Sequence, residues 1–112
     1  MFAEAFRKTG KLDLRCLWLG HNQINDLGML SLITAFQISL PKLESLLLYS
    51  NDLTDSTMYA LSTASANGGL NRLRILCLQN NVGVTRNGKA AVKVAMAALA
   101  RGRGQRQLKV FI

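Results

Sequence analysis

The chain has 112 residues, 49% of them hydrophobic, and a formal net charge of +8. This length and apolar content suffice for one small hydrophobic core. No stretch approaches the roughly 20 consecutive apolar residues of a membrane-crossing helix. The composition therefore predicts a single domain over residues 1–112 with no membrane partner.

A motif of the form LxxLxLxxN occurs three times. The copies are LRCLWLGHN from Leu14, LESLLLYSN from Leu43 and LRILCLQNN from Leu73, so their starts lie 43 − 14 = 29 and 73 − 43 = 30 residues apart. That spacing accommodates a strand, a turn, a helix and a return loop. We therefore expect one strand–helix unit to be stacked three times.

The elements can be placed in chain order from this motif. FAEAF, from Phe2 to Phe6, is interpreted as the closing helix of an earlier unit, and LKVFI, from Leu108 to Ile112, as a partial fourth strand. Within each copy, alternate leucines should point into the core. These core leucines are Leu17, Leu19, Leu46, Leu48, Leu76 and Leu78.

Turns and helices follow each strand. The asparagines that end the three copies, Asn22, Asn51 and Asn81, stand where an amide side chain can bond backbone groups of its own turn and of a neighbouring one. Helices are predicted over 26–37, 55–66 and 85–100, because Asp or Thr at their starts can accept from free N–H groups. Gly68 and Gly102 are placed to end the last two helices.

The pattern continues beyond each asparagine. Aliphatic residues follow two positions later at Ile24 and Leu53, and acidic residues four positions later at Asp26 and Asp55. The whole pattern resembles the ribonuclease-inhibitor-like leucine-rich repeats, LxxLxLxxNxIxDxGxxxLxxAL, over roughly residues 2–112. The third copy departs from it by one inserted residue in the turn near Gly83.

The resemblance implies an α/β right-handed solenoid. Its parallel strands would line the concave face, its helices would cover the convex face, and an asparagine ladder would link the turns. About three full repeats, starting near residues 14, 43 and 73, would be flanked by terminal half-repeats, with the partial strand over 108–112.

Outward strand positions are the candidate binding surface. Aligned by copy, they form three columns: Cys16, Ser45, Ile75 and Val110; then Trp18, Leu47, Cys77 and Ile112; then Gly20, Tyr49 and Gln79. The middle column is entirely apolar, whereas solvent-facing strand positions are ordinarily mixed. We therefore predict a protein-interaction scaffold, with a partner protein or a second copy of the chain as the occupant. The predicted contact residues are Trp18, Leu47, Tyr49, Ile75, Cys77, Gln79 and Ile112.

A purely structural explanation of these exposed residues also stays open. Trp18 and Leu47 could support each other as a cross-strand pair, or the chain's own tail could cover them. Arg15, Glu44 and Arg74 precede the columns in the same register and predict a ladder of alternating charge along one edge. Exposed pairs of this kind add little stability.

The charge is unevenly distributed. All six acidic residues lie at or before Asp55, whereas basic residues continue to Lys109. The alternative function is therefore polyanion binding, to nucleic acid or an acidic protein, through the basic C-terminal half and its RGRGQR tract. No aromatic residues are interleaved with these charges, which disfavours specific nucleic-acid binding. A basic last helical turn followed by a solvated loop accounts for the tract better than a binding role does.

The sequence gives little support for catalysis or for cofactor binding. GVTRNGKA, from Gly83 to Ala90, resembles a phosphate-binding loop, but Ala90 replaces the hydroxyl residue that would bind magnesium. His21, Cys16 and Cys77 lack the paired spacing of a zinc site and supply no oxyanion hole. We therefore predict no enzyme activity, no cofactor and no metal.

The two cysteines bear on the compartment. Cys16 and Cys77 fall on strands with one other strand between them, roughly 10 Å apart, which is too far for a disulfide. Reduced thiols, the absence of an N-x-S/T sequon and a start without an apolar leader segment predict a cytoplasmic protein.

Overall fold

Four short parallel strands form one sheet in the computed structural model, which describes residues 15–39, 42–102 and 107–112. The strands lie in the order β1-β2-β3-β4. Their bounds are β1 Cys16–Trp18, β2 Ser45–Leu47, β3 Ile75–Cys77 and β4 Lys109–Phe111. The predicted α/β class with parallel strands is confirmed. The segment from Phe2 to Phe6 lies outside the described residues.

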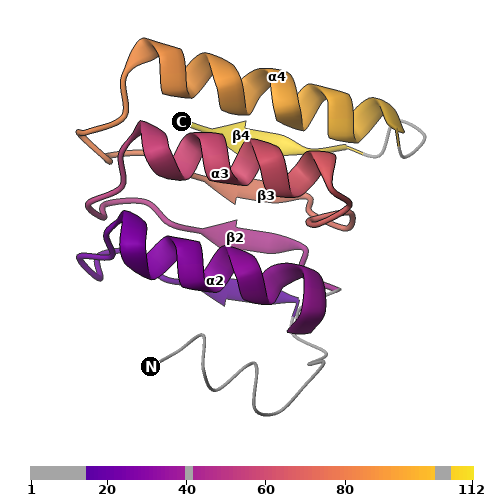
Figure 1. Cartoon of the computed structure of the whole chain (residues 1–112), viewed down its shortest axis with the longest axis horizontal. Coiled ribbons are helices and arrows are strands. Elements are labelled where there is room, and N and C mark those ends of the chain that lie inside the picture. Colours follow the sequence, from indigo (N-terminus) through magenta and orange to yellow (C-terminus); the bar gives the residue numbers. More distant parts are fainter. Residues whose placement is uncertain (1–14, 40–41, 103–106) are drawn as a thin grey trace.

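Three helices connect the strands: α2 Asp26–Ser39, α3 Asp55–Ala66 and α4 Arg86–Gly102. All three lie on one side of the sheet, in front of the strands in Figure 1, and they stand side by side in chain order. The opposite side of the sheet carries no described helix. The described residues therefore form two layers, and they leave one face of the sheet open.

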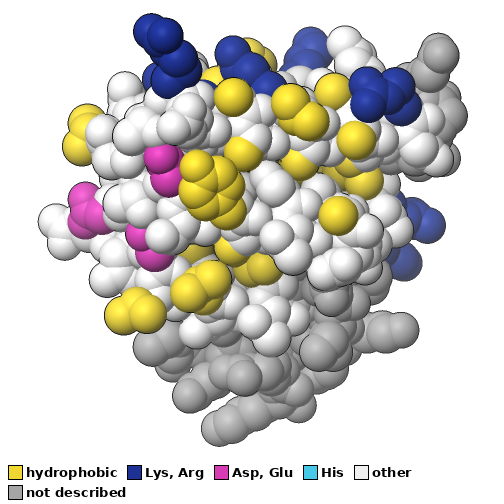
Figure 2. Space-filling model, turned by 45° about the horizontal axis from the view of Figure 1, so that its top comes forward, with side chains coloured by type: hydrophobic (Ala, Val, Ile, Leu, Met, Phe, Trp, Pro, Cys, Tyr) yellow, Lys and Arg dark blue, Asp and Glu magenta, His cyan; other side chains and the backbone are white. Residues whose placement is uncertain are grey.

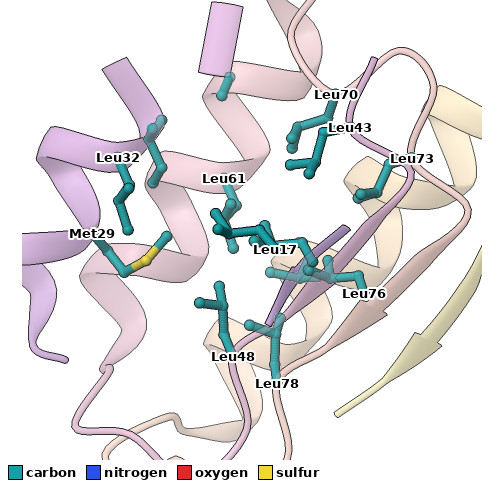
Figure 3. Close-up of a cluster of buried hydrophobic side chains, with 14 of the residues drawn as sticks. Leu17, Met29, Leu32, Leu43, Leu48, Leu61, Leu70, Leu73, Leu76 and Leu78 are labelled. Atoms are coloured by element: carbon teal, nitrogen blue, oxygen red, sulfur yellow. The ribbon is translucent and has the colours of Figure 1, made fainter. Parts of the chain in front are cut away.

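The core lies between these layers. Leu17, Leu46 and Leu76 occupy equivalent positions on three neighbouring strands and are buried. Figure 3 shows strand leucines meeting helix side chains such as Met29 and Leu61 in one cluster. Burying one such side chain contributes about 1.5–3 kcal/mol. The six predicted core leucines are all buried, which confirms this part of the prediction.

The register of β4 differs from the prediction by one residue. Lys109 and Phe111, not Val110 and Ile112, stand beside Ile75 and Cys77. A slip of one residue exchanges the two faces of a strand. The observed register places Val110 and Ile112 partly buried against the core and leaves Lys109 in solvent, which is the less costly arrangement for a charged side chain.

The helix boundaries match the predicted ones closely, and Thr85 directly precedes α4, but the first two helices are not capped by the predicted aspartates. Asn25 accepts at Oδ1 from the Gly28 N–H, and Thr54 caps α3 by accepting from the Ser56 N–H. At the end of α3, Gly68 has a φ of +90°, and the N–H of Gly69 donates to the Ala64 carbonyl. This is a glycine C-cap, as predicted.

Two rows of polar side chains connect successive turns. Asn51 is buried, accepts from the N–H groups of Asn22 and Ile24, and donates from Nδ2 to the Leu19 carbonyl. Asn81 repeats this arrangement one turn further on, where it accepts from Asn51 and Leu53. Each amide therefore satisfies backbone groups on two neighbouring turns, as the asparagine prediction requires.

The carboxylates form the second row. Asp26 accepts from the N–H and hydroxyl of Thr54 and from the hydroxyl of Thr57. Asp55 accepts in the same way from the N–H and hydroxyl of Thr85. The predicted role of Asp26 and Asp55 as caps of their own helices is thus wrong, because both carboxylates bond the next turn instead.

In the described part of the chain, none of the helices is both long enough and apolar enough to cross a membrane.

Candidate functional site

The open face of the sheet is the first candidate surface, here called the strand face. It consists of the outward strand residues Cys16, Trp18, Ser45, Leu47, Ile75, Cys77, Lys109 and Phe111. Trp18 is 69% exposed and Phe111 is 42% exposed, whereas Leu47 and Cys77 between them are partly buried. An apolar row therefore crosses all four strands.

An aromatic contact holds one end of this row in place. The Trp18 indole Nε1 donates to the hydroxyl of Tyr49 at 2.6 Å, across from β1 to the residues that follow β2. The Tyr49 ring lies against Gly20, where any β-carbon would overlap it. His21 packs edge-on against the same ring, with centroids 5.3 Å apart. The indole is therefore held in one orientation although most of it is in solvent.

The predicted contact residues are mostly brought together. Trp18, Leu47 and Cys77 share the apolar row, and Tyr49 bonds its first member. Ile112 does not belong to the row and packs partly buried against the core instead. Phe111 takes the place that was predicted for Ile112. The alternation of the charged Lys109 with its apolar neighbours could have indicated that Phe111 shares its face.

The remaining two predicted residues flank the row. Ile75 lies beside Ser45 and Lys109 in the adjacent column, and Gln79 is exposed beyond the end of β3. Gln79 and Ile112 both line a hollow of about 460 Å³ at that end. Ile75 therefore lies on the open side of the sheet, whereas Gln79 lies beyond the end of β3.

Charges collect along the other edge of the strand face. Glu44 accepts from Arg15 at 2.8 Å and lies 3.9 Å from the Arg74 guanidinium, which confirms the predicted alternation of charge. A hollow of about 330 Å³ opens beside this cluster. Its lining residues are Glu44, Ser45, Arg74, Ile75, Gln107 and Lys109. This edge therefore combines several cations with one carboxylate.

The helix layer is a second candidate surface. Figure 2 shows Lys and Arg side chains spread along α4, with apolar side chains between and below them. The exposed cations of α4 are Arg86, Lys89, Lys93 and Arg101. Leu27, Tyr59 and Val94 are exposed apolar residues of this layer. Exposed apolar area is thus not confined to the strand face.

The loop that resembles a phosphate-binding motif is occupied by a side chain of the protein itself. Asp55 bonds the N–H and hydroxyl of Thr85, and its carboxylate fills the space next to Gly88 that a β-carbon would need. A carboxylate at this position repels an incoming phosphate. Gly88 therefore serves the packing of α4 against α3.

The reactive side chains are scattered. The described residues contain no group of three or more His, Cys, Asp or Glu side chains placed to hold a metal ion. Cys16 and Cys77 are both free thiols, and burial raises the pKa of Cys77. A raised pKa keeps this thiol protonated and unreactive at neutral pH.

No family model matches the chain, and no curated protein or solved structure shows significant similarity to it. The functional argument therefore rests on the geometry and charge of the two surfaces.

Proposed function

We propose that the chain is a short leucine-rich-repeat solenoid of the ribonuclease-inhibitor-like type, and that its strand face, as the concave surface, binds a partner protein. The observation that carries the proposal is the exposed but oriented indole of Trp18. The three motif copies, 29 and 30 residues apart, support the solenoid part of the proposal, as do the bonds between successive turns.

Interface energetics favour this surface. Tryptophan and tyrosine are enriched among the few residues that carry most of the binding energy of an interface. A side chain that is already fixed loses little conformational entropy when it is covered. The apolar row extends over four strands, about 14 Å at ~4.8 Å per strand, which is wide enough for one segment of a partner.

Affinity capture with matched variants tests the proposal. We expect Trp18→Ala to weaken partner binding by at least about 1–2 kcal/mol while leaving the melting temperature nearly unchanged, because an outward side chain contributes little to the core. Tyr59→Ala is the control, since it removes a 49% exposed aromatic from the helix layer. Leu46→Ala is the unfolding reference, because Leu46 is fully buried.

The variants separate the outcomes clearly. If Tyr59→Ala weakens capture and Trp18→Ala does not, the helix layer is the binding surface. If Trp18→Ala unfolds the chain as severely as Leu46→Ala, the indole belongs to the core and the proposal is wrong.

Polyanion binding is the second candidate, and the row of exposed cations along α4 favours it. Counterion release makes the affinity for a polyanion fall steeply with salt, whereas an apolar contact is far less sensitive. Heparin affinity measured across a salt series in wild type and Lys89→Gln/Lys93→Gln decides whether α4 supplies such a site.

A further inference from the structure

Resting on the proposed function, we infer that the segment seated on the strand face is an acidic, amphipathic segment of a partner protein. Its apolar side chains would cover the row from Trp18 to Phe111, and its carboxylates would lie along the adjoining charged edge. The juxtaposition of an apolar row and a surplus of cations on one face carries this inference.

The charges of that edge do not balance. Glu44 is the one acidic residue there in the described chain, and it is already shared between Arg15 and Arg74. Lys109 lines the hollow of about 330 Å³, and Arg72 lines a second hollow that shares Glu44 and Arg74 with it. Neither cation pairs with a carboxylate among the described residues. The described residues of this edge therefore carry a net positive charge that an acidic ligand would neutralise.

The spacing suits one segment that makes both contacts. Lys109 and Phe111 are two residues apart on β4 and project from the same face, so their Cα atoms lie roughly 7 Å apart. In an amphipathic peptide, an apolar residue and an acidic residue that flanks the apolar side are separated by a similar distance. One segment can therefore reach Phe111 and Lys109 together. Complementary charge at this distance would fix the orientation and register of the bound segment.

A second copy of the chain fits this edge poorly. The chain carries +8, and the strand face of a second copy would bring the same cations and no surplus of carboxylates to Arg74 and Lys109. Like charges at an interface are costly. An acidic partner segment removes this repulsion and supplies the carboxylates that the edge lacks.

Three labelled peptides of one design test the inference. They share the same apolar residues on one face of a twelve-residue amphipathic sequence and carry Glu, Gln or Lys at the flanking positions. Fluorescein anisotropy reports binding, and the emission of Trp18, the only tryptophan, reports contact with the strand face. We expect the Glu peptide to bind most tightly and to change this emission.

Charge-reversal variants locate the contact. We expect Lys109→Glu to weaken binding of the Glu peptide by about fivefold or more, as the reversal of a charge next to a ligand does. Lys93→Glu is the matched control, because it changes the net charge equally on the exposed side of α4. We expect it to change the affinity less than twofold at about 0.15 M salt, where charges beyond ~8 Å are screened.

Each remaining outcome overturns the inference in a recognisable way. Equal binding of all three peptides leaves an apolar contact and the proposed function, but removes the acidic partner. Equal weakening by Lys93→Glu and Lys109→Glu shows diffuse attraction to the basic half. Binding of none of the peptides at about 1 mM, an interaction weaker than about −4 kcal/mol, rejects the acidic segment and leaves the proposed function to the Trp18→Ala comparison.

Discussion

Hydrogen bonds from single polar side chains connect successive turns. Asn51 and Asn81 each satisfy backbone groups on two turns, and both are buried. Each of these buried amides bonds five backbone groups and has no apolar substitute, because the groups left behind would lack both protein and water partners.

The first prediction concerns Asn51. We expect Asn51→Ala to lower the free energy of unfolding by about 1–3 kcal/mol, because it leaves buried donors and acceptors unsatisfied. Thermal or urea melts measure the effect. Asn22→Ala is the control, because Asn22 is exposed and, among the described residues, its side chain bonds only the Gly20 carbonyl. Equal losses in the two variants would contradict this account of the asparagines.

The second prediction concerns Asp26 and pH. Partial burial acts to raise the pKa of this carboxyl, but hydrogen bonds from Thr54 and Thr57 together outweigh it and hold the pKa below its ordinary value of 3.8. A depressed pKa contributes stability that is complete above the ordinary value and is lost as the pH falls through the folded value.

The comparison of wild type with Asp26→Asn isolates this contribution. We expect the stability advantage of wild type to be constant from neutral pH to about pH 5 and to shrink below 3.8 as the carboxylate gains a proton. Urea melts across this range measure it. An advantage that stays constant well below 3.8 would mean that the threonine bonds do not depend on the charge.

At the scale of elements, α4 packs against α3 through a glycine. A β-carbon on Gly88 would overlap the Asp55 carboxylate and press on Met58. We therefore expect Gly88→Ala to destabilise the chain by about 1–3 kcal/mol, although alanine favours a helix by up to ~1 kcal/mol. Thermal melts test this expectation.

Gly102 provides the matched control within the same helix. Nothing lies within 4 Å of a β-carbon placed there. Gly102→Ala should therefore be neutral or slightly stabilising. If both substitutions behave alike, the close approach of the two helices at Gly88 does not constrain their packing.

Much of the arrangement of strands and helices in two layers could be predicted from the sequence, because the periodicity of the leucines indicates which side chains are buried. Leucines at fixed intervals placed β1, β2 and β3, and the spacing placed the helices. The sequence predicts the wrong register for β4, because the columns that contain Val110 and Ile112 follow from matching LKVFI to the motif with Leu108 as its first leucine. Burial of Val110 and exposure of Lys109 set the register instead.

Contacts between side chains of different turns were harder to predict. Asp55 was a reasonable helix cap by type, but the sequence does not show that the Thr85 N–H and hydroxyl lie within its reach. The Trp18–Tyr49 bond likewise depends on the room that Gly20 leaves for the ring. The candidate surface was therefore predicted by position, and its ordering was found only in three dimensions.

At the scale of the whole molecule, net charge opposes association and apolar surface favours it. We expect weak self-association through the strand face that strengthens as added salt screens the +8 charge. Binding of the acidic peptide should respond to salt in the opposite sense. Sedimentation velocity at low and high salt measures the first effect, with Trp18→Ala as the control.

A monomer at every salt concentration and at high micromolar protein would contradict the expected self-association. Association that persists in Trp18→Ala would instead assign it to another surface, such as the apolar residues of the helix layer.

The turn after β3 determines how such a chain could be lengthened. The Val84 N–H donates to the Asn81 carbonyl within its own turn, and Arg86 begins α4 where Asp26 and Asp55 begin the earlier helices. Residues 43–72, in contrast, bond both neighbouring turns in both ways. Asn51 accepts from the preceding turn and Thr54 donates to it, whereas Leu53 donates to the following turn and Asp55 accepts from it. An in-frame duplication of 43–72 would keep both rows of bonds, whereas a duplication of 73–102 would interrupt the carboxylate row at the new junction, where Arg86 begins the helix in place of an aspartate. The middle segment is therefore the one that evolution or a designer can copy.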